Sequence, residues 1–320
     1  MTAAFCRFRW SAATLVLLAG AAPAQPPQFG GNQPDFVRQG QRLMREGKPE
    51  EALSLYQTVL KANPDSVPAH NAAGILLDLM GKGEDAREHF QKAIDLAPGA
   101  AAKANAQRAM AMSWGFSGNC KETVKYEQMV LQYYAETKDF YQQGEMADEA
   151  ARVCIDNDDF DTAYQWYRTG HDLGLKQPDI PADRKSLWEF RWEHAQARVA
   201  ARKGNQTEAD KHVQAAKAIL DKDPQMAGQQ AIFFPYLMGY VALYRGDYQT
   251  ALEQLQKANQ NDPFIQCLMG DAYEKLGQKD KALECYKKAA ATTAHNPPAA
   301  FAVPYAKKKL AAPAKAGKKS

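Results

Sequence analysis

The side chains that could do chemistry are scattered along this sequence, without the spacing of a metal or catalytic motif. The six histidines, at positions 70, 89, 171, 194, 212 and 295, form no His-Glu-x-x-His and no His/Cys zinc pattern. The run Gly115-Phe116-Ser117-Gly118 lacks the spacing of a hydrolase nucleophile elbow, and the chain has no glycine-rich phosphate loop. We therefore expect no catalytic residue, no metal and no cofactor.

An acidic stretch at residues 156–161, Asp-Asn-Asp-Asp-Phe-Asp, begins like a calcium-binding loop. Asp161 stands where such a loop needs glycine, and Tyr167 stands where it needs a bidentate glutamate. The stretch is better explained as a solvated turn between two helices.

The elements that position these side chains follow from an internal repeat. Two segments match at an interval of 34 residues, with small, aromatic and helix-ending residues in register. The matching positions are Gly40 and Gly74, Ala52 and Ala86, Tyr56 and Phe90, and Pro64 and Pro98. A second block near the C-terminus has the same pattern at Gly239, Ala251, Pro263, Gly270, Ala282 and Tyr286, with an alanine interval of 31 residues.

Each repeat predicts two short amphipathic helices packed against each other. Small residues such as Gly40 and Ala52 allow the two helices to approach closely, and Tyr56 is expected to fill the space between pairs. Gly47 predicts a left-handed end to the first helix, and Pro64 predicts the stop of the second.

This pattern resembles the tetratricopeptide-repeat family. The resemblance implies an all-α, right-handed solenoid of antiparallel helix pairs. We expect about seven units, with divergent middle ones. It also implies a concave groove, lined by the first helix of each pair, that binds other proteins.

The expected organisation has seven segments. They are a signal peptide (1–24), a flexible lead-in (25–33), two clear repeat units (34–100), divergent helical pairs (101–228), two clear units (229–291), a breaker with a capping helix (292–310) and a disordered Lys/Ala tail (311–320).

Several residues are candidates for the partner groove. In the first two units these are Val37, Gln41, Met44, Ile75 and Leu79, a mixed and partly apolar set. Such a set suits an amphipathic or extended protein segment better than the acidic tails that a subgroup of the family holds with a Lys/Arg/Asn clamp. Trp188 and Trp192 either seal an enlarged core between repeats or line the groove.

The cysteines outside the leader suggest one cross-link. The repeat places Cys120 at the start of one helix and Cys154 near the end of the next, at the same edge of the solenoid. A Cys120–Cys154 disulfide is therefore a hypothesis, with two buried free thiols as the alternative. Cys267 and Cys285 share one helical pair on less favourable faces.

The N-terminus has the features of an export signal. Arg7 and Arg9 precede a short apolar run at residues 10–22, and Ala22-Pro23-Ala24 gives a cleavage pattern. We expect a periplasmic or secreted bacterial protein cleaved near Ala24, with an uncleaved anchor as the alternative. The cleaved chain would have no transmembrane span.

The charge distribution argues against nucleic acid as a partner. Without the two leader arginines and the six lysines of positions 307–309, 315, 318 and 319, 32 basic residues face 37 acidic ones, so the body carries roughly −5. The lysine tail could make a weak envelope contact.

The most economical function is an exported scaffold that binds protein or peptide partners and is not an enzyme. One alternative is an accessory subunit of an envelope enzyme or assembly complex. A remote one is a cryptic enzyme with a pocket in the middle repeats.

Overall fold

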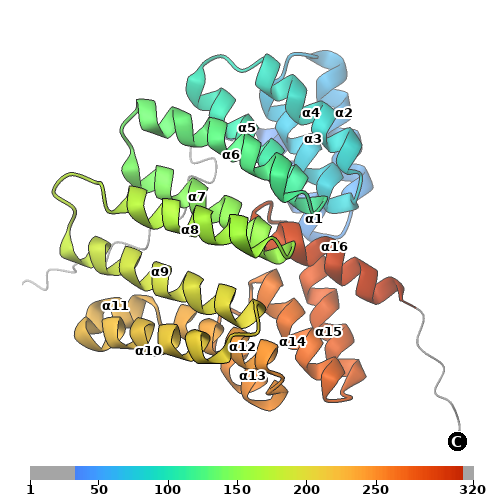
Figure 1. Ribbon diagram of the computed structural model, residues 1–320. Helices are drawn as coiled ribbons and strands as arrows, with labels where there is room; N and C mark the ends of the chain where they lie inside the picture. Colours follow the sequence, from blue (N-terminus) through green and yellow to red (C-terminus); the bar gives the residue numbers. More distant parts are fainter. Residues whose placement is uncertain (1–32, 313–320) are drawn as a thin grey trace, which may run out of the picture. The chain divides into compact units, whose positions relative to one another are not determined.

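Helices follow one another in antiparallel pairs along the described part of the chain (Figure 1). The computed structural model describes residues 33–312, which form one compact unit from Pro34 onward. Within this range there are 16 helices and no strand. The expected signal peptide, nearly all of the lead-in and residues 313–320 of the tail lie outside the described residues.

Seven pairs make up the solenoid. They are α1 (Asp35–Arg45) with α2 (Pro49–Ala62), α3 (Val67–Met80) with α4 (Gly83–Asp95), α5 (Ala100–Phe116) with α6 (Cys120–Glu136), α7 (Phe140–Asp156) with α8 (Phe160–Gly174), α9 (Ala182–Arg202) with α10 (Gln206–Lys222), α12 (Phe233–Arg245) with α13 (Tyr248–Leu255), and α14 (Pro263–Lys275) with α15 (Lys279–Ala290). The short α11 (Pro224–Gln229), which was not predicted from the sequence, precedes the sixth pair, and α16 (Pro297–Ala311) follows the last.

The ends of the helices have sequence-encoded signals. The side chains of Asn119, Asp139 and Asp159 each accept a hydrogen bond from the backbone N–H three residues later, which caps α6, α7 and α8. Gly81, with φ of +88°, ends α3 in the left-handed conformation that favours glycine. These local signals set the length of each helix and therefore the repeat.

The repeat glycines have a more specific role than the sequence suggested. A Cβ atom on Gly40 would lie 2.1 Å from the hydroxyl oxygen of Tyr56, and one on Gly74 would lie 2.7 Å from the ring of Phe90. The aromatic rings therefore occupy the space above the glycine of their own pair, and are not confined to the space between pairs. Gly270 and Tyr286 repeat this contact in the last pair.

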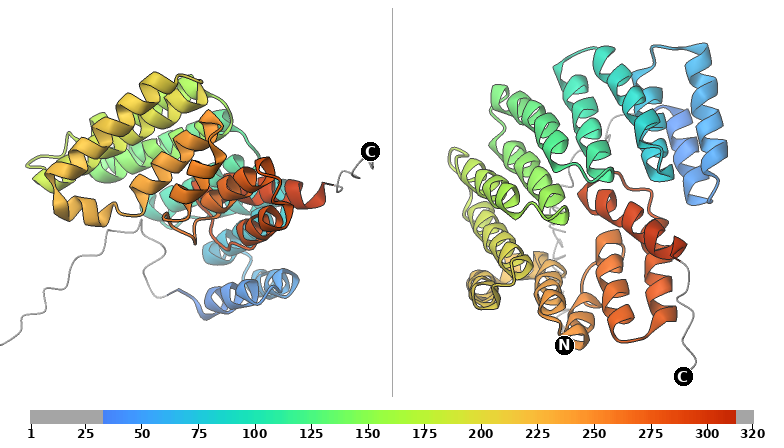
Figure 2. Two further views of the ribbon diagram at one scale, coloured as in Figure 1. Left: turned by 90° about the horizontal axis from the view of Figure 1, so that it is seen from below. Right: turned by 45° about the vertical axis from the view of Figure 1, so that its right-hand side comes forward.

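The last helix does more than cap the last pair. α16 packs against α14 and α15, as a capping helix would, but it also packs against α5 and α7. In both views of Figure 2 it lies next to the first half of the solenoid as well as the second. The expectation of a simple cap was therefore incomplete, because short-range sequence patterns do not encode contacts between distant repeats.

Candidate functional site

The expected groove residues lie on the first helices of the first two pairs. Gln41 on α1 is exposed, and Val37 is half-buried against a core that the first two pairs share. Met44, Ile75 and Leu79 instead contact an apolar cluster that includes residues of α16. The groove in this region is thus occupied by a helix of the same chain.

Small apolar side chains of α16 fill this part of the groove. Ala299 and Val303 are at most 1% exposed and share a cluster with Leu79 and the half-buried Phe116. Because alanine and valine are short, α16 can approach the α3 and α5 backbones closely. The contact is a helix laid into a groove between helices.

A polar network lies beside the apolar contact. Nε2 of His295 donates to Oδ2 of Asp78 over 2.8 Å, and the hydroxyl of Ser113 donates to Oδ1 over 2.9 Å. Asp78 is only 2% exposed, and the His295 ring stacks on Phe116 with 5.1 Å between centroids. The buried carboxylate therefore has partners from α5 and from the segment before α16.

The other end of α16 is also tied to α3. Nζ of Lys307 donates to the backbone carbonyl of Leu79 over 2.6 Å, close to the C-terminus of α3. A cation at this position satisfies a terminal carbonyl and interacts favourably with the helix dipole. Burial lowers the pKa of Lys307.

The two candidate tryptophans face other elements. Trp188 is fully buried, and a Cβ atom on Gly144 or Gly174 would lie 2.4 or 2.1 Å from its indole. Trp192 packs on His171 and Tyr164 of α8, with ring centroids 5.5 and 5.3 Å away. The long α9 uses both tryptophans to pack against the fourth pair, and Trp192 stays half-buried.

A second polar centre joins helices α7, α8, α9 and α14. The guanidinium of Arg198 on α9 lies 5.0 Å from the ring of Tyr167 and donates to its hydroxyl over 2.8 Å. Arg152 on α7 lies 4.5 Å from the ring of Phe264 on α14. These contacts join the fourth and fifth pairs to the last one.

The charges in this centre are buried. Arg198 is 6% exposed, and its Nε has no hydrogen-bond partner; the same holds for Nε and Nη2 of Arg152. Asp156 lies 3.8 Å from Arg152, and burial raises the pKa of this carboxyl to about 6 despite the nearby arginines. The centre joins α7, α8, α9 and α14 through buried arginine side chains.

This centre was not predicted from the sequence, although the sequence carries a signal for it. Arg198 and Arg202 are four residues apart on α9, and Tyr236, Tyr240 and Tyr244 repeat the same spacing on α12. Residues at this spacing share one helix face. Which faces meet is decided by the packing of the pairs.

An open hollow of about 600 Å³ lies at the far end of the solenoid, lined by α12, α14 and α16. Tyr305 donates to Asp271 over 2.6 Å, and Lys309 bonds Glu274 and Asp271. The polar groups named here pair with one another.

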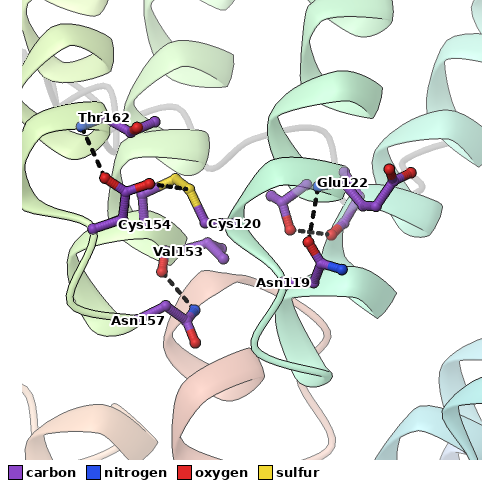
Figure 3. Close-up of a disulfide and its surroundings, with 10 residues drawn as sticks. Asn119, Cys120, Glu122, Val153, Cys154, Asn157 and Thr162 are labelled. Carbon is purple, nitrogen blue, oxygen red and sulfur yellow. Dashed lines mark hydrogen bonds between the residues drawn. A yellow bond between two sulfur atoms is a disulfide. The ribbon is translucent and has the colours of Figure 1, made fainter.

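The structure joins Cys120 and Cys154 in a disulfide (Figure 3). Cys120 is the first residue of α6 and Cys154 lies in the last turn of α7. The bridge ties the third pair to the fourth at one edge. Cys267 and Cys285 are buried free thiols.

Among residues 33–312, no group of three or more His, Cys, Asp or Glu side chains is arranged to hold a metal ion. In the same range no helix has the length and apolar character needed to cross a membrane. The acidic stretch at 156–161 forms the turn between α7 and α8, where Asp159 caps α8.

Comparison with known families identifies the repeats. Residues 37–101 and 263–293 match tetratricopeptide-repeat family models. These stretches are the first two units and the last one, where the sequence pattern is clearest. The chain is a tetratricopeptide-repeat protein.

Individual relatives are distant. A 71-residue stretch is 32% identical to the uncharacterized protein y4yS of Sinorhizobium fredii; it covers 22% of this chain and 39% of that protein's length. The crystal structure of the apo form of RapI is 12% identical, with a TM-score of 0.52 over 86% of this chain and 97% of that one. A tetratricopeptide-repeat protein from Parabacteroides merdae is 12% identical, with a TM-score of 0.47 over 86% and 96%. The likeness to RapI supports the fold alone.

Proposed function

We propose that this chain is an exported scaffold that binds segments of other proteins on the inner face formed by the first helices of its pairs. The observation that carries the proposal is that this face already receives a helix, α16 of the same chain. The tetratricopeptide fold supports protein partners. We expect no catalytic activity from the chain alone.

Export is supported by two features of different kinds. The N-terminal sequence has a basic, an apolar and a small-residue part in the order of a signal peptide. The Cys120–Cys154 disulfide fits an oxidising compartment such as the periplasm. The location is therefore proposed to be periplasmic or extracellular.

Crosslinking in cells tests the scaffold proposal. A photoreactive amino acid is placed at the exposed Gln41 of α1, and at the exposed Gln57 of α2 as a matched control on a second helix. Purification and mass spectrometry then identify the captured proteins. We expect a reproducible envelope or secreted protein from position 41 and only background from position 57. Equal background from both positions would contradict the proposal.

A further inference from the structure

The contact between α16 and the first half of the chain, called here the closing contact, involves α3, α5 and α7, and Ala300 of α16 meets α5 at Gly115. Ala299, Val303 and Lys307 recur every four residues within α16, so they lie on one face of the helix, and His295 lies just before it. All four contact the first half of the chain: His295 bonds Asp78, Ala299 and Val303 pack with Leu79, and Lys307 bonds the Leu79 carbonyl.

The other face of α16 is anchored independently. Phe301, Ala302, Tyr305 and Ala306 belong to the core cluster of the last pairs. Tyr305 also bonds Asp271 of α14. The contacts of α16 with α14 and α15 and its contacts with α3 are therefore made by different side chains.

The surface of the first pairs beneath α16 has a defined chemistry. Met44, Ile75, Leu79 and Phe116 provide an apolar floor, with the buried carboxylate of Asp78 beside it. Within the described residues, the segment from His295 through α16 supplies a matching group for each part of this surface. His295 bonds the carboxylate, Ala299 and Val303 cover the apolar floor, and the ammonium of Lys307 bonds the end of α3.

We propose that this surface is an exchange site, at which a helix of a protein partner with the same four-residue pattern replaces the inward face of α16. This inference rests on the proposed scaffold function and specifies the segment that the scaffold binds. The partner helix carries a histidine or other cation, two small apolar residues and a lysine at successive intervals of four. Because α16 competes for the surface, the apparent affinity of the partner is reduced by the fraction of closed chains.

A peptide exchange experiment tests the site. The probe is a fluorescent peptide of residues 292–312 added to the full chain, and its binding is followed by anisotropy. In the chain, His295→Ala removes the bond to Asp78 and Val303→Asp disrupts the apolar contact. We expect each variant to bind the peptide about tenfold or more tightly than the unaltered chain, because a larger fraction of chains is open.

Two controls make the outcome specific. Tyr305→Phe alters the face of α16 that packs on α14 and leaves the closing contact intact, so peptide binding should match that of the unaltered chain. Leu79→Asp, added to His295→Ala, should abolish binding. Folding of each variant is checked by circular dichroism and thermal unfolding; His295→Ala alone suffices if Val303→Asp does not fold.

The proposal is overturned if the peptide does not bind, binds all chains equally, or is unaffected by Leu79→Asp. Its failure is distinct from failure of the scaffold function. Crosslinking at position 41 can still capture a partner when the peptide does not exchange, and a lack of captured partners would contradict the scaffold whatever the peptide does.

Discussion

The indole of Trp188 on α9 lies directly against Gly174 at the end of α8, where a Cβ atom would come within 2.1 Å of the ring. This contact joins the fourth and fifth pairs, the region in which the repeat pattern is weakest. Because Gly174 has no side chain, the indole of Trp188 can occupy the space beside it.

Gly174→Ala should therefore destabilise the chain by about 2–3 kcal/mol, because the methyl group forces the indole out of a close-packed site. Urea unfolding followed by tryptophan fluorescence measures the change. The matched control is Gly228→Ala in α11, where a Cβ atom meets nothing within 4 Å. It should be neutral or stabilising by up to about 1 kcal/mol. Equal effects of the two substitutions would contradict this packing argument.

Glu127 occupies the aromatic position of the third unit, 16 residues after Ala111, as Tyr56 follows Gly40. It is fully buried with no hydrogen bond to either oxygen, and burial raises its pKa well above the usual value. Glu127→Gln should stabilise the chain by about 1–3 kcal/mol at neutral pH, because no carboxylate then has to be desolvated.

Denaturant unfolding at pH 7 measures the effect of Glu127→Gln. Glu149→Gln is the natural comparison, since Glu149 pairs with Arg108 and its replacement leaves the guanidinium without that partner. That variant should be destabilised. A loss of stability in Glu127→Gln would show that its carboxylate has a partner in solution.

The disulfide closes a loop with a sequence separation of 34 residues. The paired substitution Cys120→Ser with Cys154→Ser should lower the free energy of unfolding by about 3–4 kcal/mol, through the larger entropy of the unfolded chain. Thermal unfolding measures the loss. Thiol titration in denaturant should rise by two groups per chain on reduction, and an unchanged count would show that no bridge forms.

Asp148 makes stability depend on pH. Its side chain faces Arg191, with Glu145 and Arg198 nearby, and burial raises its pKa to about 7, well above its ordinary value near 4. The folded state therefore holds a proton that the unfolded state has lost. The stabilisation is complete below about pH 4 and is lost as the pH rises to about 7, by at most about 1.4 kcal/mol per pH unit.

Asp148→Asn should remove this contribution, so the difference in stability between variant and unaltered chain should grow from pH 4 to pH 7. Comparing the two chains at each pH cancels the opposite effect of His194, whose pKa is lowered by burial. Urea unfolding at several pH values measures the slope. Parallel pH profiles for the two chains would contradict the raised pKa.

Local signals in the sequence determined the class of fold. Gly40, Ala52 and Tyr56 at fixed spacing predict a helix pair because a close helix crossing needs small residues and an aromatic ring beside them. The middle pairs were harder to recognise because Glu127 stands at the aromatic position and the intervals between Thr123, Ala163 and Ala209 lengthen to 40 and 46 residues. Their caps, such as Asn119 and Asp139, are local and remain visible in the sequence.

The candidate site was predicted only in part. Met44, Ile75 and Leu79 were expected to face a partner, and they do face a helix, but it is the chain's own α16. His295 and Asp78 are separated by 217 positions, and neither residue type indicates the other. The sequence by itself determined the helix pairs and their order, because each pair is fixed by contacts within about 34 residues. Only the tertiary structure decided that the solenoid closes on α16, because small changes in packing at each successive pair accumulate until distant repeats meet.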